Sequence, residues 1–127
     1  MLCLTSVRLA LVLCVAVAAC GGKLDRNQLS AQVQSLHALA AEAHLLWVNR
    51  GAGDTPGAYA RVQTDQLVEK IKDAVKALDA GTEPELDPYL RDAQLLGTAL
   101  ESAARFGRGD LGDLEARLAV LDEKVRP

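Results

Sequence analysis

The stretch LSAQVQSLHALAAEAHLLW, residues 29–47, decides the fold, because its apolar residues recur at spacings of three and four. Side chains with this spacing share one face of an α-helix, and that face turns toward a protein core. Before the stretch, Asp25 and Gln28 fit a capping box, in which two side chains satisfy free backbone N–H groups at a helix start. We therefore expect a first helix from about Asp25 to about Asn49, where a glycine-rich segment follows.

Two further helices with the same apolar pattern follow. Thr55-Pro56 fits an N-cap followed by proline at the first helical position, where no N–H is needed, and Gly81 fits a C-terminal stop. Two starts stay open for the third helix, because Thr82 with Glu85 and Asp87 with Pro88 both have a start signature. The Gly-Arg-Gly sequence at 107–109 ends this helix.

A fourth, shorter helix begins after Asp110 or Asp113, either of which can cap it. No window alternates apolar and polar residues as a half-buried strand does. The sequence therefore predicts an all-α protein. The short links between helices favour an antiparallel up-down-up-down four-helix bundle, and a three-helix core with a loosely docked fourth segment is the alternative. The apolar residues of the fourth helix are Leu114, Leu118, Leu121 and Val125.

The composition excludes several classes of protein. A chain of 127 residues suits one domain. Without residues 1–19 it has 13 basic and 17 acidic residues, a net charge of -4, because the leader contains only one charged residue, Arg8. Such a balance argues against a nucleic-acid partner, which requires a basic surface. The cysteines are Cys3, Cys14 and Cys20, so the region beyond residue 20 contains no internal disulfide or cysteine-ligated metal.

The first nineteen residues have the layout of an export signal. One basic residue, Arg8, precedes an uninterrupted apolar run, residues 9–19, which ends in the small residues Ala18 and Ala19 before Cys20. This run is much shorter than the ~20 residues that a membrane-spanning helix needs. We therefore expect a cleaved signal rather than a permanent anchor.

The sequence Val17-Ala18-Ala19-Cys20 resembles the lipobox of bacterial lipoproteins. The resemblance implies cleavage before Cys20, transfer of a diacylglyceryl group to its thiol, and acylation of the new amino group with a palmitate-type chain. Two or more acyl chains hold a protein firmly on a membrane. Gly21 rather than Asp follows the cysteine, which in this family implies sorting to the outer membrane, facing the periplasm. An ordinary secretory signal or an uncleaved apolar helix is the alternative.

These features divide the chain into a signal peptide (1–19), a lipidated cysteine with a short tether (20–24) and a helical domain (25–127). Four alternating helices bring both chain ends to the same end of a bundle, which then faces the membrane. The loops near residues 50–55 and 106–112 are expected at the opposite end.

Aromatic and arginine residues gather beside those two loops. Both types are enriched where proteins contact each other. The structural alternative is that Trp47 fills the core and that Arg50 and Arg105 compensate the negative ends of helices. The candidate partner surface consists of Trp47, Arg50, Tyr59, Arg61, Arg105, Phe106 and Arg108.

The sequence contains little that points to catalysis or to a cofactor. His37 and His44 are seven residues apart, and neither has a metal-ligating residue three or four positions away. There is no phosphate-binding glycine loop, nucleophile elbow or clear acid–base pair. We therefore expect no enzyme, metal or cofactor, but a membrane-anchored envelope lipoprotein that binds a protein or polymer. The alternative is a periplasmic metal or small-ligand carrier that uses the bundle interior around His37, His44 and Trp47.

Overall fold

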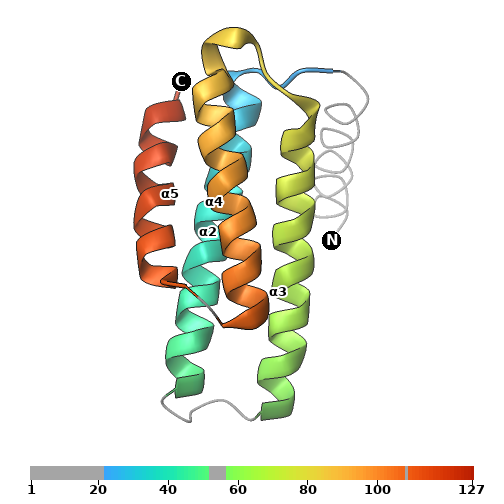
Figure 1. Ribbon diagram of the computed structural model, residues 1–127, viewed down its shortest axis with the longest axis vertical. Coiled ribbons are helices and arrows are strands. Elements are labelled where there is room, and N and C mark those ends of the chain that lie inside the picture. Colours follow the sequence, from blue (N-terminus) through green and yellow to red (C-terminus); the bar gives the residue numbers. More distant parts are fainter. Residues whose placement is uncertain (1–21, 52–56, 108) are drawn as a thin grey trace, which may run out of the picture.

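The computed structural model describes residues 22–51, 57–107 and 109–127. Four α-helices account for most of them: α2 (Arg26–Gly51), α3 (Gly57–Ala77), α4 (Asp87–Phe106) and α5 (Leu111–Val125). Two short 3₁₀ helices, η1 (Leu78–Ala80) and η2 (Pro84–Leu86), join α3 to α4. The described residues form no strand, so the predicted all-α class is confirmed (Figure 1).

The helix starts at α2 and α5 are capped as expected. The backbone N–H of Gln28 donates to Asp25 Oδ1 at 2.8 Å, and the backbone N–H of Asp25 donates to Gln28 Oε1 at 2.9 Å. These two bonds are the predicted capping box. Asp110 is the N-cap of α5, because its Oδ1 accepts from the backbone N–H of Asp113 at 3.0 Å. The predicted caps at Thr55-Pro56 lie outside the described residues.

The start of α4 differs from both expected starts. Asp87 is the first residue of the helix rather than its cap, and the N-cap position is Leu86, which has no capping side chain. Thr82 forms no capping box with Glu85, since the Thr82 Oγ1 is buried and has no hydrogen-bond partner among the described residues. The η2 turn between them, with Pro84 at its start, carries the chain into α4 instead.

All four helices contribute to one core. The apolar face of α2 is fully buried, and α5 contributes the fully buried Leu118 and Val125 to the same cluster. The fourth helix is therefore an integral part of the core, unlike the loosely docked segment of the alternative. The largest fully buried side chains are Leu29, Val33, Leu36, Ile71, Leu78, Leu100, Leu118 and Val125.

The contacts between α2 and α5 show how these two helices align. His37 lies near Asp122 and His44 lies near Glu115, so residue numbers rise along one helix as they fall along the other. Figure 1 shows the four helices packed side by side along their length. The start of α2 and the C-terminus lie at the same end, where Arg26 Nη1 donates to the backbone oxygen of Arg126 at 3.2 Å.

The same end also holds the residues that lead into α2. Leu24 is buried in the core cluster, and its backbone N–H donates to the carbonyl oxygen of Gly81 at 2.7 Å. Leu24 also forms an isolated bridge with Thr82. Leu24, one residue before the capping box of α2, is therefore part of the fold.

A glycine in the middle of α4 allows the helices to approach closely. A Cβ atom on Gly97 would lie 2.8 Å from Val75 Cγ2 on α3 and 3.4 Å from Leu36 Cδ1 on α2. Contacts below 3.0 Å do not occur between real carbon atoms, so a side chain here requires its neighbours to move. Gly97 thus sets how closely α4 packs against two helices at once.

We expect Gly97→Leu to destabilise the bundle by about 1–3 kcal/mol, because the larger side chain overpacks the contact with Val75 and Leu36. The free energy of unfolding measured in urea checks this. Thr98→Leu is the matched control, because Thr98 is the next residue of the same helix and is exposed. Equal stability of the two variants would contradict the close approach at Gly97.

Candidate functional site

The end of the bundle opposite to Leu24 contains most of the residues that the sequence singled out. We call it the tip: it comprises the C-terminal turns of α2, the N-terminal turns of α3, and the link from α4 to α5. Figure 1 shows α2 and α3 continuing beyond the α4–α5 link. The last turns of α2 and the first turns of α3 therefore have fewer helical neighbours among the described residues than the rest of the bundle.

Trp47 is held in place by a glycine that ends α4. Gly107 adopts a left-handed conformation (φ 65°, ψ 26°), and its N–H donates to the carbonyl oxygen of Ala103 at 2.9 Å. A Cβ atom on Gly107 would lie only 2.7 Å from Cη2 of Trp47. The half-buried indole thus packs directly on the backbone of the α4–α5 link. This contact joins the two parts of the tip.

Arg105 and Phe106 form the outer edge of the α4 terminus. Arg105 Nη2 pairs with Glu101 Oε1 at 3.3 Å, one turn earlier on α4. Its guanidinium carbon lies 6.0 Å from the centre of the Phe106 ring, within the range of a cation–π contact. The Phe106 side chain is 65% exposed. An aromatic ring with an arginine beside it is therefore available to solvent at the tip.

The structure describes some of the remaining residues of the predicted surface in full and others only by their backbone. Arg61 is exposed on the N-terminal part of α3. Arg50 lies in the last turn of α2 and Tyr59 in the first turn of α3, so the backbone brings both to the tip. Arg108 lies outside the described residues, as does Cys20, the predicted site of lipidation.

Several exposed apolar side chains near the tip were not predicted from the sequence. Leu45 and Val48 on α2 and Val62 on α3 are each more than half exposed. The only hint in the sequence is that apolar residues near Trp47 extend beyond one helical face, since Leu45 and Val48 flank the pair Leu46-Trp47. With Phe106 they make the tip more apolar than the arginines alone suggested.

A shallow groove of about 290 Å³ runs between α2 and α3 toward the tip. Its lining consists of three leucines, three carboxamides, one lysine and one carboxylate. Carboxamides both donate and accept hydrogen bonds, as peptide groups and sugar hydroxyls do. The lining residues are Glu42, Leu45, Leu46, Asn49, Gln63, Gln66, Leu67 and Lys70.

The two histidines lie on the seam between α2 and α5. His44 Nδ1 lies 2.9 Å from Glu115 Oε2, and His37 Nδ1 lies 3.7 Å from Asp122 Oδ2. Each acid comes from a different helix than its histidine, so residue spacing along α2 could not reveal the pairs. Both imidazoles are partly exposed, which places them at the edge of the seam and outside the core.

Asp122 is a buried acid that residue spacing did not single out. Its side chain is 7% exposed, and its Oδ2 lies 3.5 Å from Arg126 Nη2 as well as near His37. Its Oδ1 has no hydrogen-bond partner within the described part of the chain. Burial of a carboxylate is costly unless opposite charges compensate it. The Arg126 guanidinium supplies the opposite charge, and the proximity of His37 places this end of α5 against α2.

We expect Gly107→Ala to displace Trp47, because the new methyl group would occupy the space of the indole and because φ is positive there. Trp47 is the only tryptophan, so its fluorescence emission reports this directly and should shift to longer wavelength. Gly81→Ala is the matched control. Its φ of 77° is also positive, yet a Cβ atom on Gly81 would have no neighbour within 4 Å, so the change should destabilise without an emission shift.

The described residues give no indication of a metal centre or a spanning helix. Within residues 22–51, 57–107 and 109–127, no three His, Cys, Asp or Glu side chains are grouped so that they could hold a metal ion. None of the helices in these ranges combines the length and apolar character needed to cross a membrane. In comparisons with known proteins, no family model, no curated protein and no solved structure matches this chain.

Proposed function

We propose that this chain is a bacterial envelope lipoprotein with a non-enzymatic binding function. In this proposal, residues 1–19 are removed, acylated Cys20 holds the protein on the outer membrane, and the mature chain is an antiparallel up-down-up-down four-helix bundle in the periplasm. The tip of the bundle binds another envelope component. A protein is the favoured partner, and an envelope polymer is the alternative.

The observation that carries the proposal is that few residues separate Cys20 from Leu24, which is packed into the bundle. Leu24 is buried and bonded to Gly81, so only residues 21–23 separate it from the lipobox cysteine. Three extended residues span about 10 Å. A lipid on Cys20 would therefore keep this end of the bundle at the membrane surface and would direct the tip away from it.

The length of α2 sets how far the tip would stand from the lipid. At ~1.5 Å per residue, the 26 residues of α2 extend for about 40 Å. The exposed Phe106 and the apolar groups near Trp47 would then be presented well beyond the lipid headgroups. Arginine and aromatic side chains contribute most of the binding energy in many protein interfaces, which favours a protein partner at this end.

We expect lipidation to depend on Cys20 alone among the three cysteines. Intact-mass analysis of the membrane form should give a chain that begins at Cys20 and carries acyl groups. Cys20→Ser should abolish both the acyl mass and membrane association, because an uncleaved or unacylated chain lacks the anchor. Cys14→Ser is the control, since Cys14 lies within the leader and should leave both unchanged. A free thiol at Cys20 in the natural protein would refute the anchor.

We expect the tip to contact its partner directly in the cell. A photo-crosslinking phenylalanine analogue at position 106 should yield a discrete adduct of reproducible mass. Arg61→Ala with Arg105→Ala should reduce the adduct about tenfold, as loss of interface arginines commonly does. The same analogue at Lys76 is the control, because Lys76 is exposed in the last turn of α3, at the end of the bundle opposite to the tip. Adducts of equal yield at both positions would argue against a specific tip surface.

A further inference from the structure

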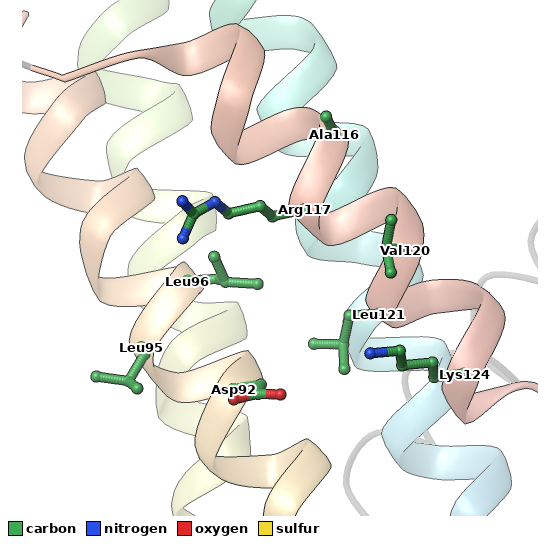
Figure 2. A pocket seen from close by; sticks show the side chains of 8 residues that line it. All are labelled: Asp92, Leu95, Leu96, Ala116, Arg117, Val120, Leu121 and Lys124. Carbon is green, nitrogen blue, oxygen red and sulfur yellow. The ribbon is translucent and has the colours of Figure 1, made fainter.

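A second apolar surface lies between α4 and α5, away from the tip. Figure 2 shows this groove from outside the bundle, with α2 and α3 behind it. Its volume is about 440 Å³, and Leu95 and Val120 on its two sides are 71% and 53% exposed. Large apolar side chains exposed side by side are a feature of surfaces that contact another molecule. No other described helix covers this face.

The groove between α4 and α5 has an acidic residue on its α4 side and two basic residues on its α5 side. Asp92 on α4 and Lys124 on α5 lie opposite each other at one end, and Arg117 lies on α5 toward the other end. Arg117 Nε pairs with Asp113 Oδ2 at 2.9 Å. Neither Asp92 nor Lys124 has an ion pair with any other described residue. Asp92 and Lys124, which lie at the same position along the helix axes, are therefore available for an external partner.

We propose that the α4–α5 face is the contact between two copies of this chain, related by a twofold axis parallel to the helices. Such an axis places α4 of one copy over α5 of the other at equal height. Asp92 of each copy then faces Lys124 of the other, and Leu95 and Val120 of the two copies come together next to these charges, toward Arg117. The surface is thus self-complementary, as an interface with twofold symmetry requires.

The other twofold arrangement of the same faces is unfavourable. An axis perpendicular to the helices would place α5 against α5 in opposite directions. Lys124 of one copy would then lie against Arg117 of the other, and this would occur twice. Like charges across an interface oppose association, so the charge pattern selects the parallel axis. That axis also leaves the beginning of α2 at the same end in both copies, which suits two chains anchored in one membrane.

The size of the face sets the strength of the contact. The 15 residues of α5 extend about 22 Å, and two helices side by side are about 20 Å wide. The contact would bury roughly 900 Å² in total, which is in the range of weak, reversible interfaces. The dimer should therefore depend on concentration, and confinement of both copies to one surface would favour it.

Cysteine crosslinking in intact cells tests this arrangement with the full chain. Two differently tagged copies, one with Leu95→Cys and one with Val120→Cys, are produced together and treated with a short bismaleimide before lysis. We expect a crosslinked product that contains both tags. The control combines Leu95→Cys with Gln66→Cys, an exposed position on α3, and measures random collisions and the background from the natural cysteines. A 95–120 yield no higher than the 95–66 yield would overturn the proposal.

A charge exchange then tests the orientation. Asp92→Lys or Lys124→Asp, introduced into both tagged copies, should lower the 95–120 yield about fivefold, because each creates two like-charge contacts. The two changes combined should restore the yield, since opposite charges again face each other. Failure of the combined variant to recover would overturn the parallel axis. The outcome is independent of the tip, because no residue changed here lies at the tip.

Discussion

The burial of one face of α2 is the constraint on which the rest of the structure depends. Leu29, Val33, Leu36, Ala40 and Ala43 alternate at spacings of four and three and are all fully buried. Because α2 packs against α3, α4 and α5, this one face supplies the surface that each of the other helices covers. The large residues lie toward the Leu24 end and the alanines toward the tip, so the packing is not uniform along the helix.

Two glycines, Gly97 within α4 and Gly107 directly after it, allow large side chains of α2 to pack closely. Gly97 lies beside Leu36, and Gly107 lies beside Trp47, eleven residues later on α2. Residue numbers therefore increase in the same direction along α2 and α4. Leu36 and Trp47 each lie against a glycine, which has no side chain to displace them. Glycine is needed at these two positions for different reasons. Gly97 lies within the helix, where glycine lowers helix propensity but permits close packing. Gly107 has a positive φ, which ends the helix.

Apolar spacing and capping residues were sufficient to predict the helices, but not the register in which one helix packs against another. The Asp25–Gln28 box and the Asp110 cap are local, and both were predicted from the sequence. The predicted caps of α4 were wrong, because the η2 turn, with the buried Leu86, leads directly into the helix and Asp87 is its first residue. The pairing of His44 with Glu115 requires the register of α2 against α5, which periodicity within one helix does not contain.

The exposed apolar residues of the tip could likewise not be predicted from the spacing of residues along one helix. Its arginines and aromatics could be selected by residue type, whereas the exposure of Leu45, Val48 and Val62 depends on where α4 ends and α5 begins. Since α4 ends at Phe106 and the chain turns back through Gly107, the last turns of α2 and the first turns of α3 extend past α4 and α5. The apolar residues at the tip therefore follow from unequal helix lengths. The proposed anchor at Cys20 would act at the opposite end, separated from this exposed apolar surface by the length of α2.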